Sequence, residues 1–588
     1  MISLSPFQIL PAHVVQIVVS HVAGTSRLVS DGVTTTSEEH KLLLMPLMWV
    51  SRNFRDITCQ EFYKSNTVKI IGNSVDIDTS QYSKSPRLRK FYRSTHFFAR
   101  ELDIIVNKSD IFAGRSLDAL SCTTFDGCAF PLARKLKFSF CVSYEQKMAW
   151  YSRQKERQQQ NLVESTQPQL QLQNYDAAAS AATINANISA FVKRIKEMTP
   201  KVREIEVVGG SAFVDQSPDT EHFVSLVARL FRLATRIAYK FDDGTKPLDL
   251  RVDTISNLVY IDIMADSIDP IAQLARQSAG TLQSLCIKTC GRGDISGLIQ
   301  SAHGDYVEYS QLRVLRLNHC SDFNDDNRLV FPGAAPFPYL RLLSIASTYP
   351  FADDVVFRRN AATLKYLDIR LERDMALLLM AYNVFTRTSH PRLQYVKTRI
   401  VGDIASHLLA ASTSYLKILL AIAPSAAVRS IEGISSSAEI VSALVQYSCL
   451  GSIQILSLSD TQFDLWDAIT LIESLPLLSD LHAMSPILGS FPADAIVDRL
   501  PVYVLSEYAP IGPRFRCWHA HYSREANLGE VVACVLLLVL ICPNFDYCTP
   551  PKFLQKQFMG LIARAVSSEE YKQHAPRLLR LLFSREMQ

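Results

Sequence analysis

The hydrophobic residues of this chain recur in a short phrase, apolar-x-x-apolar-x-apolar, whose last two apolar positions alternate with polar ones. The clearest copy is Leu312-Arg313-Val314-Leu315-Arg316-Leu317, which continues to Asn318-His319-Cys320. Such alternation predicts a strand with one buried face. Helix-like stretches lie between copies, as in residues 271–278, where apolar residues are three apart and Gly280 follows as a helix stop. The pattern therefore predicts one strand and one helix per repeat.

Looser copies of the phrase follow one another along the chain. From Leu258 to Leu393 their first residues lie 24 to 30 residues apart, and from there to Leu478 they lie 25 to 35 apart. The copies begin at Val202, Leu258, Leu282, Leu312, Leu340, Leu364 and Ile453, with weaker ones at Leu393, Val428 and Leu478. The phrase and its period resemble those of leucine-rich repeats, whose period is roughly 20–29 residues. A repeat cannot bury its apolar face alone, so stacking of neighbours is implied.

The first part of the chain lacks the phrase and has helical spacing. Leu10-Pro11 opens a segment with apolar residues at Val14, Val15, Ile17 and Val18, and a second apolar stretch leads into Val50-Ser51-Arg52-Asn53-Phe54-Arg55-Asp56-Ile57. This opening and this closing element resemble those of the F-box. The order of an F-box followed by leucine-rich repeats is similar to that of F-box/leucine-rich-repeat proteins, of which fungal genomes hold large divergent sets.

That resemblance implies a Skp-type adaptor as partner. The residues that would contact it are Leu10, Pro11, Val14, Val15, Ile17, Val18, Val50, Ser51, Arg52, Phe54, Arg55 and Ile57. A second interpretation stays open, in which the same apolar helices only cover the first repeat of the solenoid.

The predicted fold class is α/β: an irregular leucine-rich-repeat solenoid with a curved parallel sheet and helices outside. The F-box-like helical segment spans residues 1–65, the solenoid 66–500 and a helical C-terminal capping segment 501–588. Early strands are expected at 67–71, 102–106 and 136–140. A Gln-rich stretch at about 151–176 is expected to be a disordered insertion, followed by a helix at roughly 177–197.

The end of the chain is expected to hold strands at 502–505 and 515–521 and a final helix at about 551–584. Its run from Val531 to Cys542 is the longest apolar one, and at 12 residues it is shorter than the roughly 20 that a membrane-spanning helix needs. The run predicts a buried helix instead. Capping segments are expected because the terminal repeats of a solenoid would otherwise expose their core.

Composition narrows the function classes. A chain of 588 residues is too long to form a single ordinary hydrophobic core. A solenoid is not subject to this limit, because it grows in one direction by adding repeats. A net charge of +4 gives no support to a nucleic-acid or membrane-surface role. The start has no secretory signal, and the 12 cysteines form no paired framework. We expect an intracellular protein, cytoplasmic or nuclear, with reduced thiols.

Candidate chemistry is sparse. Cys517-x-His519-x-His521 places three possible metal ligands on one strand face, but no second ligand pair stands at zinc-site spacing, so packing without a metal is the expectation. The loop 291–297 lacks the spacing and the lysine of a phosphate-binding loop, and the acidic loop 322–326 lacks the glycine and final glutamate of a calcium loop.

No serine-hydrolase elbow, zinc-protease motif or phosphate loop occurs in the sequence. We therefore expect a non-catalytic adaptor with no cofactor, the substrate-recognition subunit of a Skp–cullin–F-box type ubiquitin ligase. Its protein substrate would bind the repeat face, through exposed neighbours of the core such as Arg313, Arg316 and Asn318. The alternative is a leucine-rich-repeat interaction scaffold with no link to a ligase. An enzyme built on the C-terminal segment is a third, weaker hypothesis.

Overall fold

The structure is a computed structural model of the whole chain. It describes residues 15, 57–58, 67–71, 76–77, 99–106, 108–114, 130–140, 181–209, 219–241, 255–265, 268–289, 296–300, 306–318, 336–347, 362–372, 392–401, 426–432, 441, 451–458, 461, 463, 465–484, 512–521, 528–545, 547–548, 555–567, 572–573, 575–576 and 578–579. The chain divides into two compact units, residues 1–292 (unit 1) and 293–588 (unit 2).

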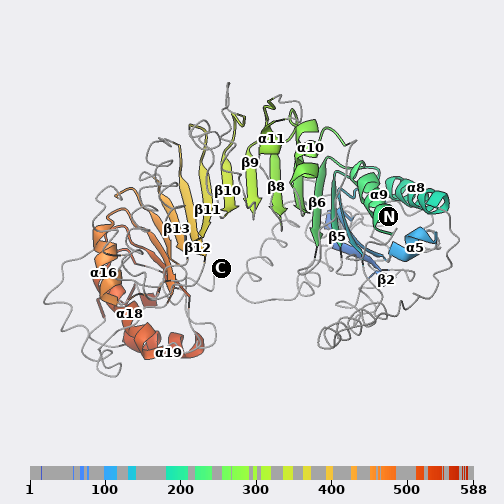
Figure 1. The fold of residues 1–588 in the computed structure, drawn as a ribbon. Coiled ribbons are helices and arrows are strands. Elements are labelled where there is room, and N and C mark those ends of the chain that lie inside the picture. The colour runs from blue at the N-terminus through green and yellow to red at the C-terminus, as the bar shows by residue number, and fades with distance from the viewer. Residues whose placement is uncertain are drawn as a thin grey trace, which may run out of the picture. The chain divides into compact units, whose positions relative to one another are not determined.

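The described part of unit 1 is a parallel sheet with helices (Figure 1). Its strands pair in the order β2-β1-β3-β4-β5-β6-β7-β8, and each pair is parallel except β1 with β2. The strands are β1 (Thr67–Ile71), β2 (Asp76–Ile77), β3 (Glu101–Val106), β4 (Lys135–Phe140), β5 (Glu204–Gly209), β6 (Arg236–Phe241), β7 (Tyr260–Ala265) and β8 (Ser284–Thr289). The helices are α5 (Lys108–Phe112), α8 (Ala181–Met198), α9 (Asp219–Phe231) and α10 (Asp269–Gln277).

Unit 2 repeats the same plan. Strands β9 to β17 pair in chain order, each parallel to the next. They are β9 (Val314–Asn318), β10 (Leu342–Ser347), β11 (Tyr366–Glu372), β12 (Tyr395–Val401), β13 (Val428–Glu432), β14 (Ile455–Leu458), β15 (Asp480–Met484), β16 (Cys517–His521) and β17 (Tyr547–Cys548). The described helices are α11 (Ser296–Ile299), α16 (Leu465–Ser474), α18 (Leu528–Ile541) and α19 (Gln555–Ser567).

The repeated phrase sets the register of these ladders. Leu315 pairs with Leu343, which pairs with Leu367, and all three side chains are fully buried. The first leucine of each phrase is buried too, as at Leu312 and Leu340. Equivalent residues of neighbouring repeats therefore stack in rows, and each row buries apolar surface that one repeat alone would expose. The predicted α/β architecture of stacked strand-containing repeats is confirmed at this level.

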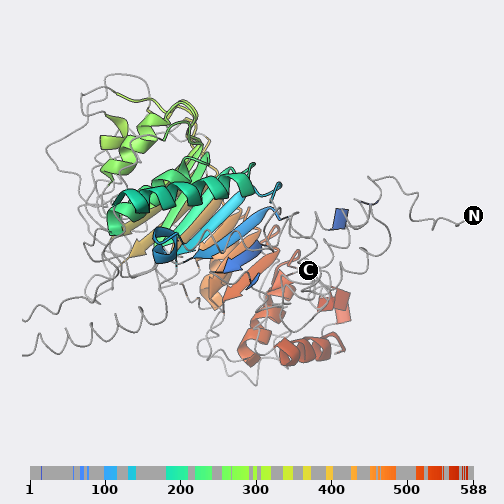
Figure 2. The same cartoon turned by 90° about the vertical axis from the view of Figure 1, so that its right-hand side faces the viewer.

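Helices α8 and α9 pack on one face of the sheet in unit 1, and Figure 2 shows α8 lying over the strands. Helix α8 buries Ile188, Phe191, Ile195 and Met198. The ring of Phe191 lies 6.3 Å from that of Phe138 in β4, and the ring of Phe223 in α9 lies 4.9 Å from that of Phe140. The apolar side of β4 thus faces the helices, and the opposite side carries its polar residues. The predicted helix at roughly 177–197 is confirmed as α8.

Two copies of the phrase differ from the sequence-based prediction. Val428 lies at the outward-facing first position of β13, not at the start of the phrase, because it pairs with Ile455 and Tyr395. The true core positions of that repeat hold Ala426 and Arg429, which are 0% and 2% exposed. Because a charged residue occupies a leucine position, the phrase cannot be recognised from the sequence of that repeat. Strand β6 was missed because Ile237 and Tyr239 follow Ala234 rather than a large apolar residue.

The C-terminal segment holds the predicted buried helix, since α18 spans Leu528–Ile541 and its described residues from Val531 to Val539 are almost fully buried. The predicted strand at 515–521 is confirmed as β16, which continues the parallel ladder past residue 500. The predicted final helix is confirmed over Gln555–Ser567 as α19, and the described residues 575–576 and 578–579 are also helical. Among the helices of the described residues, none has the length and apolar character needed to cross a membrane. The predicted strand at 502–505 and the Gln-rich stretch lie outside the described residues.

Candidate functional site

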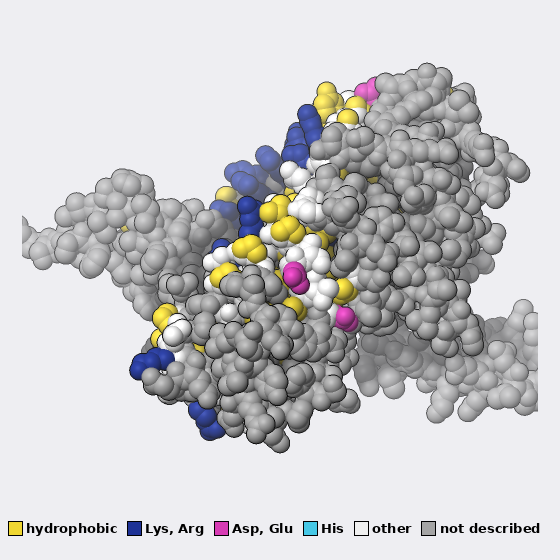
Figure 3. All heavy atoms as spheres, turned by 90° about the vertical axis from the view of Figure 1, so that its left-hand side faces the viewer, with side chains coloured by type: hydrophobic (Ala, Val, Ile, Leu, Met, Phe, Trp, Pro, Cys, Tyr) yellow, Lys and Arg dark blue, Asp and Glu magenta, His cyan; other side chains and the backbone are white. Residues whose placement is uncertain are grey.

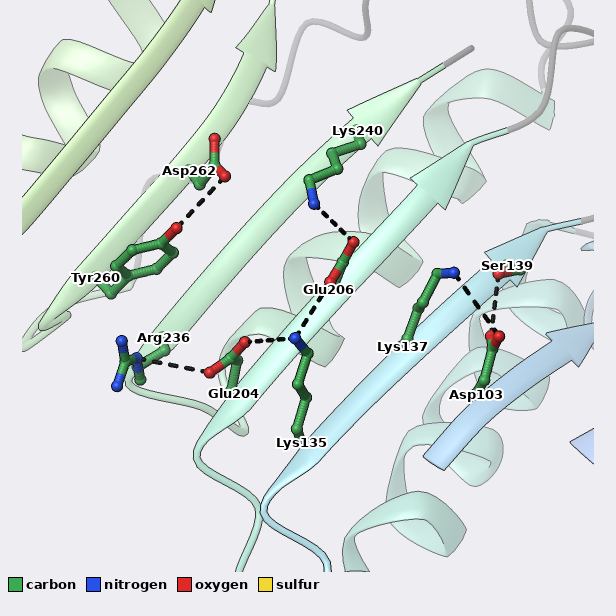
Figure 4. Close-up of polar contacts among 10 residues, drawn as sticks. All are labelled: Asp103, Lys135, Lys137, Ser139, Glu204, Glu206, Arg236, Lys240, Tyr260 and Asp262. Carbon is green, nitrogen blue, oxygen red and sulfur yellow. Dashed lines mark hydrogen bonds and ion pairs between the residues drawn. The ribbon is translucent and has the colours of Figure 1, made fainter. Parts of the chain in front are cut away.

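The outward side of the sheet in unit 1 carries a ladder of charges whose sign alternates from strand to strand. We call it the charged ladder: Asp103 of β3, Lys135 and Lys137 of β4, Glu204 and Glu206 of β5, and Arg236 and Lys240 of β6. Figure 4 shows these side chains on the side of the strands away from the helices. The positions alternate with the core positions of the same strands, so register alone brings them side by side.

The charged ladder is closed by ion pairs between neighbouring strands (Figure 4). Lys135 lies 3.1 Å from Glu204 and 3.6 Å from Glu206, and Lys240 donates to Glu206 at 2.9 Å. Further pairs join Arg236 to Glu204 at 3.6 Å and Lys137 to Asp103 at 3.7 Å, with Ser139 also donating to Asp103. Each carboxylate of the charged ladder is thus paired with a cation of a neighbouring strand, so this face adds contacts between strands rather than attracting a partner of one sign.

The network shifts the pKa of two of its members. Partial burial raises the pKa of Glu206, but the hydrogen bond from Lys240 and the charges of Lys240 and Lys135 outweigh burial and lower it. For Lys135, burial lowers the pKa, and the hydrogen bond with Glu204 and the charges of Glu204 and Glu206 outweigh burial and raise it. Both charged forms are therefore favoured by folding.

Next to this network, Tyr260 of β7 donates to Asp262 at 3.4 Å, and the guanidinium of Arg236 lies 5.0 Å from the Tyr260 ring centre. Burial, followed by the charge of Asp262, raises the pKa of Tyr260 to about 12. The phenol therefore stays neutral across physiological pH and extends the polar contacts of the ladder to β7.

The outward side of unit 2 has a different character. The first residues of successive strands form an apolar row: Val314, Leu342, Tyr366, Tyr395, Val428 and Ile455, each paired with the next. Tyr366 is 44% exposed and the others are half-buried. The rings of Tyr366 and Tyr395 lie 6.1 Å apart and are tilted by 45°. Partly exposed aromatic and aliphatic side chains in one row are typical of an interaction surface.

A row of cations lies directly beside the apolar row. It is the basic row, Arg313, Arg341 and Lys365, which precede the first three strands of that row. Backbone hydrogen bonds place these residues side by side, because Arg341 N–H donates to the Arg313 carbonyl at 2.9 Å and Lys365 N–H to the Arg341 carbonyl at 2.8 Å. Arg313 and Arg341 are exposed, as is Arg316 on the following row. Figure 3 shows a line of Lys and Arg side chains next to hydrophobic ones.

The apolar row ends at a polar cluster, the β15–β16 cluster of Asp480, His482, Cys517 and His519. Ile455 pairs with Asp480, which pairs with Cys517, and His482 pairs with His519. The two imidazoles are stacked with ring centres 4.1 Å apart, and His519 Nε2 lies 4.0 Å from Asp480 Oδ1. The structure thus adds two ligand-bearing residues to the sequence-predicted set of Cys517, His519 and His521.

The predicted adaptor-binding residues fall almost entirely outside the described part of the chain. Val15 is helical and fully buried, and Ile57 is helical and half-buried. The remaining residues from Leu10 to Arg55 lie outside the described residues. Of the residues predicted to face a partner on the repeats, Arg313 and Arg316 are exposed and Asn318 is half-buried. The loop 322–326 also lies outside the described residues.

Comparison with known proteins adds little. No protein-family model matches the sequence, and a comparison with curated proteins finds no match. A crystal structure of a structural-genomics target from Bacteroides fragilis is similar over 58% of this chain and 76% of its own, with 11% identity and a TM-score of 0.22. A likeness this weak carries no argument about fold or function, so the functional interpretation depends on the residues themselves.

Sequence reasoning named Arg313 of the basic row but missed the rest of the two rows and the charged ladder, although a usable signal was present. Once the phrases are aligned on their leucines, the residue before each strand reads Arg313, Arg341, Lys365, and the first strand residue reads Val314, Leu342, Tyr366. The exposed positions had to be compared between repeats, across 24 to 28 residues, rather than read along the chain. In stacked repeats, position within the phrase decides which side chains become neighbours.

Proposed function

We propose that this chain is a non-catalytic protein-interaction adaptor, and that its partner binds the outward strand face of unit 2 along the apolar row and the basic row. The observation that carries the proposal is the side-by-side arrangement of these rows on successive parallel strands. Tyrosine and arginine are enriched among the residues that dominate binding energy at interfaces. Solenoids use such extended faces to bind other proteins.

The chemistry of the two rows favours a particular class of partner. The three cations precede successive strands, whose backbones lie about 5 Å apart in a sheet. A protein segment with acidic side chains along one edge and apolar or aromatic side chains beside them would complement both rows. The charged ladder of unit 1 is less suited to this role, because its carboxylates already pair with its own cations.

The proposal extends to the ligase role that the resemblance implies. In that role residues 1–65 hold a Skp-type adaptor, and the repeats present the substrate to a Skp–cullin ubiquitin ligase. The interaction scaffold without a ligase remains the alternative, since the same rows would serve both.

The face of unit 2 is tested by two substitutions in the full chain, a charge reversal in the basic row and a side-chain truncation in the apolar row. Arg341→Glu and Tyr366→Ala are compared with Arg564→Glu, an exposed arginine on α19. Substrate proteins captured by the wild type and by Arg564→Glu should be lost with both row variants, and their retention should fall as salt concentration rises, whereas a Skp-type adaptor held by residues 1–65 should stay bound. Capture that is unchanged in Arg341→Glu and Tyr366→Ala would overturn the proposed surface.

The ligase link is tested separately by co-purification of the full chain with a recombinant Skp-type adaptor. Binding is expected for the wild type and for Tyr366→Ala, and is expected to disappear with Leu10→Asp and with Phe54→Asp. If the folded wild type binds no such adaptor, the ligase role fails and the scaffold alternative stands, because the first experiment does not depend on residues 1–65.

A further inference from the structure

The β15–β16 cluster gathers three different metal-ligand types at one place. The carboxylate of Asp480, the thiol of Cys517 and the imidazole of His519 each offer one ligand atom, and these atoms all lie within 4.8 Å of one another. All three residues are half-buried, so an ion could reach them from solvent. Asp480 and Cys517 face each other across two parallel strands, and His519 is two residues after Cys517 on the same strand face.

We propose that Asp480, Cys517 and His519 bind one divalent transition-metal ion, and that Zn²⁺ is the ion their sulfur, nitrogen and oxygen donors fit best. Thiolate and imidazole select zinc over magnesium and calcium, which prefer oxygen ligands. Zinc bonds of about 2.0–2.3 Å in a tetrahedron place neighbouring ligand atoms about 3.3–3.7 Å apart. Side-chain rotations that close the present spacing by about 1 Å produce that geometry.

The strand framework favours such a site. Asp480 and Cys517 belong to strands fixed by the parallel ladder, and the hydroxyl of Ser479 donates to the Asp480 carboxylate. A ligating carboxylate held by a second hydrogen bond is typical of metal sites, because the outer contact orients it. Ligands on strands also need less ordering than ligands on loops when the ion binds.

His482 has a supporting role rather than a ligand role. Its ring lies against that of His519 with an angle of 17° between the two planes. A metal ion lies in the plane of the imidazole that binds it, so an ion on His519 would lie off the plane of the His482 ring stacked on it. Three protein ligands leave one tetrahedral position for water or for a partner's side chain.

Binding of Zn²⁺ converts the Cys517 thiol to the thiolate and requires a neutral His519. The released proton goes to the buffer, so affinity should rise with pH. Sequence spacing indicated Cys517 and His519 but not Asp480, because Asp480 comes from the preceding repeat, 37 residues from Cys517.

The test is titration of the full chain with Zn²⁺ alone, in competition with a chromophoric chelator. The wild type should bind one equivalent more than Cys517→Ser and His519→Gln, each of which should bind this ion at least about 100-fold more weakly, since even outer contacts are worth about 10–100-fold. His482→Ala should keep the stoichiometry of the wild type, because His482 stacks on His519 and is not one of the three ligands. The matched control is His222→Gln on α9, which should bind as the wild type does.

Co²⁺ provides a second measurement, since a cysteine ligand gives a thiolate-to-cobalt absorption band that Cys517→Ser must lack. If circular dichroism shows that a variant does not fold, the test uses the wild type alone. Alkylation of Cys517 is then measured with and without Zn²⁺, by mass spectrometry of the peptide that contains Cys517. Protection of Cys517 by Zn²⁺ supports the site. Equal Zn²⁺ stoichiometry in the wild type, Cys517→Ser and His519→Gln, or alkylation of Cys517 unchanged by Zn²⁺, would overturn it.

Discussion

At the scale of single residues, the fold depends on side chains that the repeat phrase does not predict. Glu206 is held by two lysines from neighbouring strands, and Gly512 occupies the left-handed region of backbone space with φ +55°. Arg429 fills a leucine position and is nevertheless buried. Each of these residues is set by its neighbours in other repeats, so its consequence is visible only in the folded chain.

Replacing Glu206 with Gln should weaken the dependence of unit 1 stability on pH in the acidic range. The folded-state pKa of Glu206 is lowered, so its contribution is present above its unfolded pKa of about 4.3 and is lost as pH falls through the folded value. Melting temperatures from neutral to acidic pH should therefore fall less steeply for the variant, which starts from a lower value. Glu473→Gln on the surface of α16 is the control. If the melting temperature of Glu206→Gln fell with decreasing pH as steeply as that of the wild type, the proposed ion-pair network would be contradicted.

Replacing Gly512 with Ala should destabilise the region where β16 begins. An added Cβ would collide with the side chain of Ile472 in α16 and lie 3.2 Å from the Cβ of Phe515, and the positive φ strains any L side chain. We expect a cost of about 1–3 kcal/mol, measured by denaturant unfolding and by amide exchange in β16. Gly451→Ala, where nothing lies within 4 Å of the new Cβ, should be close to neutral. Equal effects of the two variants would argue against this packing.

At the scale of the element, one face of each strand packs in the core and the other forms the outward surface. In β11, Leu367 is fully buried between its equivalents in β10 and β12, whereas the adjacent Tyr366 points outward. Side chains alternate between faces with a period of two, so one strand both builds the core and presents the binding surface. The same division holds in β5, where Ile205 and Val207 are buried and Glu204 and Glu206 carry the charged ladder.

Replacing Leu367 with Ala should cost about 2–5 kcal/mol, because the neighbouring rows leave a cavity that the sheet cannot close. Tyr366→Ala, one residue away on the other face, should cost only about 0.5–1.5 kcal/mol, because it removes the packing of a partly exposed ring on Tyr395 and leaves no buried cavity. Denaturant unfolding of both variants tests this contrast. A loss in Tyr366→Ala as large as that in Leu367→Ala would show that Tyr366 serves the core, and its use as a binding probe would then fail.

At the scale of the whole molecule, stacked repeats contact only their neighbours, so stability is expected to be local. Leu367→Ala should speed amide exchange in β10, β11 and β12 and leave β4, β5 and β6 as in the wild type. Hydrogen exchange with mass spectrometry resolves these strands by peptide. Faster exchange in both groups of strands would mean that units 1 and 2 unfold as one cooperative body.

The sequence by itself predicted much of this architecture. The phrase at Leu312 to Leu317 located a strand and its buried face, and copies at Leu282, Leu340 and Leu364 located others. This succeeded because burial of every second residue is a local constraint, written along a few consecutive positions. It failed at β6, where the half-buried Ala234 stands at the first position of the phrase, and at β13, where Ala426 and Arg429 stand in core positions that neighbouring repeats still bury.

Only the tertiary structure decided what the outward face holds. The charged ladder, the apolar row, the basic row and the β15–β16 cluster each join residues from different repeats, separated along the chain by two dozen residues or more. Parallel pairing fixes which of them meet, and that register is settled by stacking of buried leucines rather than by the exposed residues themselves. The core could therefore be predicted from the order of residues, and the sites could not.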